Sequence, residues 1–170
     1  MKKLICSMLF AACLFTSVNC LAQVIKGTYA IKNVATGMLL RIKDANNANG
    51  TPLVAYNPVN WKCMTWDFKQ VEGQTYQLKN LFTGKTFEAK SEKASEGVAL
   101  EQQPFDAKAA DQQYEFISVG ENVYQIRLKN TDLYLSPSDS KGDINTNIIL
   151  AKKSNTKLQQ WTIYEQHPEY

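Results

Sequence analysis

Hydrophobic and polar residues alternate with a period of two along most of the chain beyond residue 23. Short runs rich in β-branched and aromatic residues are separated by turn-forming clusters such as Asn46–Gly50 and Ser136–Asp139. Such a pattern is typical of an all-β sandwich or barrel. It predicts strands at residues 28–32, 39–43, 53–56, 65–70, 75–79, 86–90, 99–102, 114–118, 123–128, 134–136, 148–151 and 161–164. Only residues 105–113 have a helical composition, and one short turn is expected there.

The apolar positions repeat three times along the chain, with steps of 47 or 48 residues. Each unit opens on a tyrosine, carries apolar residues 11 and 24 positions later, and closes on an aromatic residue. The opening and closing residues of the three units are Tyr29 and Trp66, Tyr76 and Tyr114, and Tyr124 and Trp161. A repeat of this length is one supersecondary unit in three copies, each of which needs its neighbours to bury its apolar face. The sequence therefore predicts twelve strands in three equal groups, closed into one body without exposed sheet edges.

The first 22 residues have the composition of a secretory signal peptide. Lys2 and Lys3 precede an apolar stretch over residues 4–18, and small residues lead up to Ala22. We expect cleavage after Ala22, a single domain over residues 23–170, and a secreted, periplasmic or cell-surface protein. The segment that ends at Cys13 loosely resembles a lipobox, so a lipoprotein stays open as the alternative. No later segment is apolar enough to span a bilayer.

Charge and residue content exclude several classes of function. Loss of residues 1–22 lowers the formal net charge from +3 to +1, and the remaining lysines are scattered, which argues against a nucleic-acid partner. Cys63 is then the only cysteine, so no intrachain disulfide is expected, and its simplest role is that of a small, half-buried apolar side chain. The only histidine, His167, lies in the C-terminal tail, which leaves no nucleophile with a suitable base. We therefore expect no enzymatic activity, no metal site and no cofactor.

The three units also share a set of short motifs. The first unit has an Asn-Gly-Thr-Pro turn at residues 49–52 and closes on Met64-Thr65-Trp66, and the other two close on Gln112-Gln113-Tyr114 and Gln159-Gln160-Trp161. In this outline, which covers essentially all of residues 23–170, the chain resembles the ricin-type β-trefoil lectin domain family, as a secreted bacterial member. The resemblance implies a β-trefoil with six strands in a barrel and six in a hairpin cap. It also implies that the closing aromatic residues lie in the core.

The family's sugar sites combine three elements: an acidic residue on the second strand, an aromatic residue that ends the third strand, and polar residues before the closing aromatic. At these positions the first unit has Arg41, Tyr56 and Cys63-Met64, with Trp61 nearby. The second unit has Glu88, Gln103 and Asp111-Gln112, with Phe105 as a substitute aromatic. The third has Ser136, Ala151 and Leu158-Gln159. No unit has the whole set, and the third has no sugar-binding side chains in these positions.

The first unit has two interpretations. Arg41, Tyr56 and Trp61 form a site for an acidic sugar, because arginine binds a carboxylate through two parallel hydrogen bonds and aromatic rings pack on a sugar ring. Alternatively, Arg41 is a solvent-facing strand residue and Tyr56 a surface tyrosine. For the second unit, the cluster of Glu88, Asp111 and Gln112 is the candidate sugar site, or Glu88 is an ordinary exposed strand residue.

Two functions follow from the resemblance and the degraded sites. The first is a secreted carbohydrate-binding, lectin-like module with one or two weak sites for a glycan or polysaccharide, including an acidic one. The alternative is a protein-binding β-trefoil, such as a protease inhibitor, that uses surface loops. The candidate loops are residues 44–50, 57–62, 91–97 and 137–145.

Overall fold

A computed structural model describes residues 23–169. All twelve predicted strands are present, and their bounds differ from the predicted ones by at most two residues. The strands are β1 (Thr28–Asn33), β2 (Leu39–Ile42), β3 (Leu53–Tyr56), β4 (Thr65–Glu72), β5 (Thr75–Asn80), β6 (Thr86–Ala89), β7 (Leu100–Gln103), β8 (Tyr114–Gly120), β9 (Val123–Leu128), β10 (Leu133–Pro137), β11 (Ile148–Lys152) and β12 (Trp161–Glu165). The predicted signal peptide lies outside the described residues.

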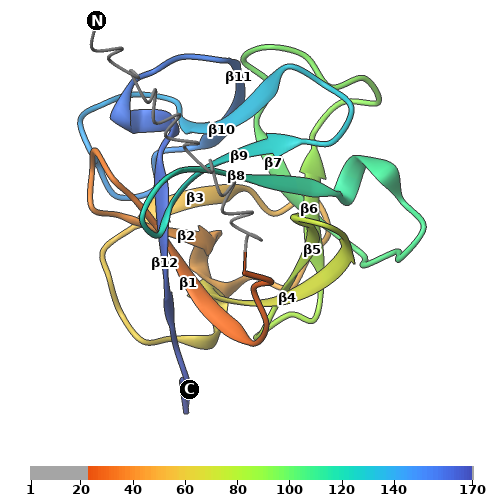
Figure 1. Cartoon of the computed structure of the whole chain (residues 1–170). Coiled ribbons are helices and arrows are strands. Elements are labelled where there is room, and N and C mark those ends of the chain that lie inside the picture. The colour runs from red at the N-terminus through yellow and green to blue at the C-terminus, as the bar shows by residue number, and fades with distance from the viewer. Residues whose placement is uncertain (1–22, 170) are drawn as a thin grey trace, which may run out of the picture.

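Six strands form a closed barrel, as the resemblance implied. In order around the barrel, β1 pairs with β4, β4 with β5, β5 with β8, β8 with β9, β9 with β12, and β12 again with β1. The other six form three antiparallel hairpins, β2–β3, β6–β7 and β10–β11, one for each repeat (Figure 1). Isolated bridges join the hairpins to one another, for example between Val54 and Asn147. The chain therefore has the predicted β-trefoil fold, and each repeat forms one lobe.

The closing aromatic residues of the three repeats fill the core in equivalent ways. Trp66, Tyr114 and Trp161 are each at most 1% exposed. Burial of a ring of this size removes roughly 150–250 Å² from water, which corresponds to about 4–6 kcal/mol. Each ring also donates one hydrogen bond to a backbone carbonyl of the second strand of its repeat. The carbonyl acceptors, at distances of 3.2, 3.1 and 3.1 Å, belong to Leu40, Phe87 and Leu135.

Buried asparagines shape the turn between the first two strands in two of the three lobes. The Oδ1 of Asn33 accepts hydrogen bonds from two backbone amides of residues 35 and 36, and Asn80 does the same with residues 82 and 83. Each turn then passes through a glycine with positive φ, Gly37 or Gly84, a conformation that side chains with a Cβ adopt at a cost. The Nδ2 of Asn80 donates to the carbonyl of Cys63 at 3.1 Å, so this side chain joins the second lobe to the first.

Short 3₁₀ turns are more frequent than the sequence suggested. The turn expected within residues 105–113 is present as η3 (Ala110–Gln112). Two equivalent turns, η2 (Lys62–Met64) and η4 (Lys157–Gln159), precede the closing aromatic residues of the other lobes, and η1 (Lys43–Ala45) follows β2. Composition alone missed these three, because each is a single turn closed by backbone hydrogen bonds.

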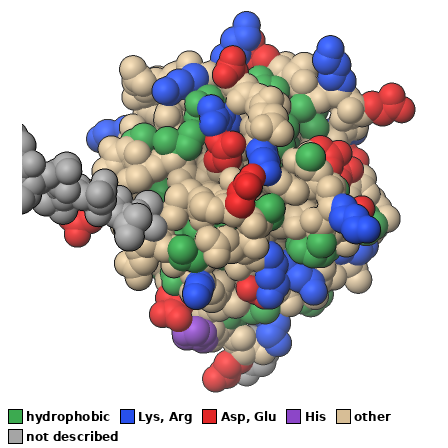
Figure 2. Space-filling model, turned by 45° about the vertical axis from the view of Figure 1, so that its right-hand side comes forward, with side chains coloured by type: hydrophobic (Ala, Val, Ile, Leu, Met, Phe, Trp, Pro, Cys, Tyr) green, Lys and Arg blue, Asp and Glu red, His purple; other side chains and the backbone are tan. Residues whose placement is uncertain are grey.

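Basic and acidic side chains alternate over the surface. Figure 2 shows Lys and Arg side chains interspersed with Asp and Glu on the face that it presents, without a large area of one charge. Within residues 23–169, no helix is long and apolar enough to cross a bilayer.

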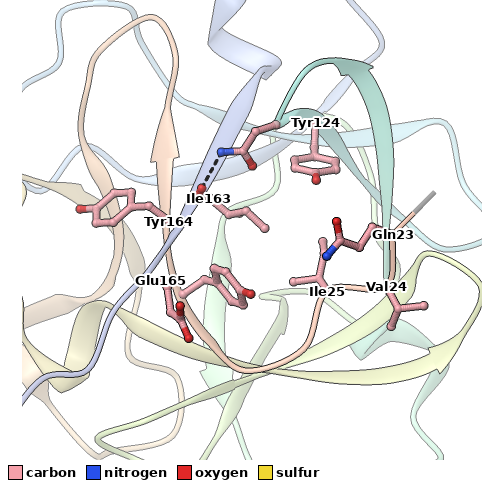
Figure 3. Close-up of a pocket in the computed structure, with 9 residues that line it drawn as sticks. Gln23, Val24, Ile25, Tyr124, Ile163, Tyr164 and Glu165 are labelled. Atoms are coloured by element: carbon pink, nitrogen blue, oxygen red, sulfur yellow. Dashed lines mark hydrogen bonds between the residues drawn. The ribbon is translucent and has the colours of Figure 1, made fainter.

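One end of the barrel is incompletely filled. Phe68 and Phe116, two residues after their closing aromatics, pack with ring centroids 5.1 Å apart, but the equivalent residue of the third lobe is the smaller Ile163. A cavity of about 270 Å³ lies beside Ile163, between Tyr124 and the N-terminal segment that carries Ile25 (Figure 3). The third lobe thus has no aromatic ring at this position, and Ile163 is one of the residues that line the cavity.

Candidate functional site

A pocket of about 230 Å³ lies on the first lobe, at its border with the second. We call it the first-lobe pocket; its lining residues are Arg41, Ala45, Trp61, Lys62, Cys63 and Phe82. Strand β2 supplies the arginine, η1 the alanine, the segment at η2 the next three, and the turn after β5 the phenylalanine. The lining is almost wholly apolar apart from the two cationic side chains.

The structure brings the three predicted residues of the first unit together. The guanidinium carbon of Arg41 lies 4.0 Å from the centroid of the Tyr56 ring, a distance at which a cation–π interaction is attractive. The Tyr56 ring in turn lies 6.3 Å from the ring of Trp61, with an angle of 33° between their planes. The position of Tyr56 at the end of β3, directly opposite β2, accounts for this arrangement. Arg41, Tyr56 and Trp61 therefore form one continuous group, in which Arg41 and Trp61 line the first-lobe pocket and Tyr56 packs beside them.

The alternative interpretation of Arg41 as a solvent-facing strand residue is wrong. Arg41 is only 7% exposed, because β2 is buried along its whole length and η2 packs against it. Its side chain makes no hydrogen bond with any of residues 23–169, and its Nε is buried without a partner. The nearest carboxylate is that of Asp44, 3.9 Å from Nη2, which is too long for a hydrogen bond, and the Asp44 side chain is 66% exposed.

The other arginine of the chain, Arg127, has the hydrogen-bond acceptor that Arg41 lacks. Arg127 on β9 donates through Nε and Nη2 to Glu115 on the paired strand β8, with an Nε–O distance of 2.8 Å. This hydrogen bonding raises the pKa of Arg127. Arg41 has no such partner in the part of the chain that the structure describes, although it is more deeply buried.

The backbone beside Arg41 adopts an unfavourable conformation. Asp44 and Ala45 have positive φ values of 53° and 51°, in the left-handed region that residues other than glycine rarely occupy. Strained conformations of this kind are retained where the surrounding structure imposes them, and they concentrate at binding sites. Here they direct Ala45 to the first-lobe pocket.

Sequence analysis missed the contribution of the second lobe. Phe82, in the turn after β5, is 51% exposed and lines the first-lobe pocket together with Trp61, which is 39% exposed. The Oδ1 of Asn80 accepts a hydrogen bond from the backbone amide of Phe82, and its Nδ2 donates to the carbonyl of Cys63. One buried side chain therefore positions the two segments that carry Phe82 and Cys63. Cys63 itself is buried, more fully than expected. The available signal was an aromatic residue in a polar turn, but its partner lobe was not visible in the sequence.

The candidate site of the second lobe is partly assembled. The Nε2 of Gln112 donates to Glu88 at 2.8 Å, so these two predicted residues are in contact. The same amide also donates to the carbonyl of Pro104 and accepts from the backbone amide of Asp106, which makes Gln112 a loop anchor. Asp111 is exposed. A sugar site here remains a prediction, with Glu88 as its oriented carboxylate.

Other features of the second and third lobes are structural. Phe105, the substitute aromatic, lies 5.8 Å from the Nζ of Lys79. Burial raises the pKa of the Tyr114 hydroxyl well above its usual range, and the negative charges of Glu88 and Asp111 raise it further. In the third lobe, Gln159 anchors its loop as Gln112 does, by hydrogen bonds to Lys152 and Ser154. Residues 23–169 contain no cluster of three or more side chains suited to a metal ion.

Comparison with known proteins agrees with this architecture. The family model described as "Ricin-type beta-trefoil lectin domain-like" matches residues 62–151, more than half of the chain. The chain belongs to this family. A comparison with the curated proteins found no match.

Solved structures of other ricin-type and designed trefoils share the fold. The designed threefold-symmetric protein ThreeFoil superposes with a TM-score of 0.78, at 18% identity over 82% of this chain and 99% of that protein. The Rhizoctonia solani agglutinin superposes with a TM-score of 0.75, at 20% identity over 85% of this chain and 98% of the agglutinin chain. The Macrolepiota procera ricin B-like lectin, solved in complex with lactose, superposes with a TM-score of 0.68, at 22% identity over 83% of this chain and 97% of the lectin chain. At these identities the likeness shows the fold, and the ricin-B-like fold suggests carbohydrate binding.

Proposed function

We propose that the protein is a secreted carbohydrate-binding module, and that its main sugar site is the first-lobe pocket. The observation that carries the proposal is the assembly of Arg41, Tyr56 and Trp61 from separate loops and strands into one group, of which Arg41 and Trp61 line the pocket. Membership of the lectin-like family and the lactose complex of the Macrolepiota procera relative support it. Secretion is supported by the composition of residues 1–22.

The chemistry of the pocket suits a saccharide. A pyranose has one face rich in C–H groups and a rim of hydroxyl groups, so an aromatic wall and a few polar groups together recognise it. The partly exposed side chains of Trp61 and Phe82 supply aromatic surface, and Arg41 and Lys62 supply hydrogen-bond donors in the same pocket. The pocket is small and open, so one site is expected to bind with a dissociation constant of roughly 0.1–1 mM. Useful avidity then requires a polymeric ligand or several copies of the domain.

Binding to a multivalent glycan array, followed by calorimetric titration with the glycans that bind, tests the proposal. Trp61→Ala is expected to weaken binding at least tenfold, because it removes the exposed stacking surface. Tyr164→Ala is the matched control, since Tyr164 is equally exposed at 39% but lies on β12, away from the pocket. Glu88→Ala reports separately on the second lobe. A protein that binds no neutral or acidic glycan contradicts the proposal.

The protein-binding alternative is tested alongside. Incubation with a panel of serine and cysteine proteases distinguishes the two functions, because an inhibitor forms a stable complex and remains uncleaved. A stable protease complex, together with no binding on the glycan array, favours the protein-binding function over the carbohydrate-binding one.

A further inference from the structure

We propose that the ligand of the first-lobe pocket is a saccharide that carries a carboxylate, and that Arg41 is the group that binds this carboxylate. The inference rests on the carbohydrate-binding function proposed above and specifies its substrate class. It departs from the acidic residue that the family pattern places on the second strand, because the residue at that position here is a cation.

The first argument is the unmet hydrogen-bonding capacity of Arg41. A guanidinium has five N–H donors and stays charged at any ordinary pH. Arg41 is 7% exposed, yet its side chain makes no hydrogen bond with residues 23–169, and its Nε is buried without a partner. The contact with Tyr56 supplies no oxygen acceptor, and Asp44 is 3.9 Å away. A largely buried guanidinium whose Nε has no acceptor is unfavourable, so a ligand that supplies an acceptor is bound preferentially.

The second argument is the sign of the charge around the pocket. Lys62 is a further cation among the lining residues, and none of the six lining residues is acidic. The hydroxyl groups of a neutral sugar can accept hydrogen bonds from Arg41 but do not neutralise its charge. A carboxylate does both, because its two oxygens match the planar fork of arginine and the hydrogen bonds are strengthened by charge.

The third argument is the apolar wall, which separates a sugar acid from a simple anion. Phosphate or acetate alone uses only the cations, whereas Trp61 and Phe82 are two partly exposed aromatic residues that line the same pocket. A sugar acid satisfies both parts, with its carboxylate at Arg41 and the C–H face of its ring on Trp61. The position of Phe82 on the second lobe places a further contact surface for the neighbouring residue of an oligosaccharide.

The experiment compares matched acidic and neutral glycans by isothermal titration calorimetry. One pair is a galacturonate trisaccharide and its methyl ester, which has the same shape without the charge. The other is sialyllactose and lactose, so the two pairs distinguish a uronic acid from a sialic acid as the source of the carboxylate. At least one acidic member is expected to bind about 10–100-fold more tightly than its neutral partner, the range for a charge-assisted hydrogen-bonded pair.

Three variants assign this preference to a residue. Arg41→Gln is expected to bind the acidic and neutral members equally, and Arg41→Lys to keep a reduced preference, because an ammonium keeps the charge but lacks the fork. Arg127→Gln is the matched control and is expected to keep the full preference. The melting temperature of each variant shows whether it is folded. The salt dependence of wild-type binding adds a measurement independent of the variants, because the acidic preference falls as ionic strength rises.

The outcomes separate the two proposals. Equal binding of acidic and neutral glycans that is lost in Trp61→Ala overturns the acidic class and leaves carbohydrate binding in place. An acidic preference that persists in folded Arg41→Gln overturns the role of Arg41. Failure of every glycan to bind overturns the proposed function itself, and this inference with it.

Discussion

Replacement of Arg41 by methionine removes a charge that the fold buries without an acceptor. Methionine keeps most of the aliphatic length of the side chain and packs favourably against an aromatic ring, so the contact with Tyr56 is partly retained. The substitution also removes the 3.9 Å ion pair with Asp44. Its effect on the free energy of unfolding is therefore a balance between lost attractions and a relieved desolvation penalty.

The magnitudes favour stabilisation. The lost cation–π contact contributes about 0.5–2 kcal/mol, and an ion pair with a partner as exposed as Asp44 contributes about 0–1 kcal/mol. Against this, the unpartnered Nε alone costs about 1–3 kcal/mol, and the buried charge costs several kcal/mol more. We therefore expect Arg41→Met to raise the free energy of unfolding by about 1–3 kcal/mol. For a domain of this size that corresponds to a rise in melting temperature of roughly 3–8 °C.

Urea unfolding followed by tryptophan fluorescence measures this change, because Trp66 and Trp161 are buried in the core. Arg127→Met is the matched comparison, and a decrease of about 1–3 kcal/mol is expected, since it leaves Glu115 without its partner. The reasoning is refuted if Arg41→Met loses stability as Arg127→Met does. That result would mean that Arg41 has an acceptor in solution, and it would remove the basis for an anion site.

Three further predictions follow from other parts of the molecule. Asp44→Asn is expected to raise the affinity for acidic glycans about two- to fivefold by removing the carboxylate that lies 3.9 Å from Arg41, as measured by calorimetry. Ile163→Phe, which restores the ring found at Phe68 and Phe116, is expected to fill part of the barrel-end cavity and to stabilise by about 1 kcal/mol in urea unfolding. Tyr114→Phe is expected to cost about 1 kcal/mol at neutral pH through its lost hydrogen bond, and to flatten the fall in stability above about pH 10.

The sign of the pH effect follows from the raised pKa of Tyr114. The unfolded chain loses the tyrosine proton near its ordinary pKa of about 10, while the native state still holds it, so stability falls as pH rises above that value. Urea titrations at neutral and alkaline pH test this, and an identical alkaline slope in Tyr114→Phe contradicts it. For Asp44→Asn, an unchanged or lower affinity for acidic glycans contradicts the prediction. For Ile163→Phe, a loss of stability does so and indicates overpacking against Tyr124.

The strands could be predicted because they depend on the local alternation of hydrophobic and polar residues and on a threefold repeat. Tyr29, Tyr76 and Tyr124 recur in register with the closing aromatics, and the family resemblance implied the burial of Trp66 and Trp161 that the structure shows. The site was only partly predictable. Arg41 and Tyr56 were found from their positions in the repeat, but the burial of Arg41 depends on the loops that fold over β2, which no local pattern describes.

The sequence by itself determined the number and order of the strands, the threefold repeat and the core positions, because each depends on residues close together in the chain or on an exact period. The tertiary structure alone decided that Phe82 of the second lobe completes a pocket on the first, that Arg41 lies in it without an acceptor, and that Ile163 leaves a cavity at the barrel end. Those properties are distances and volumes between side chains far apart in the chain. They exist only once closure of the barrel has brought the lobes into contact.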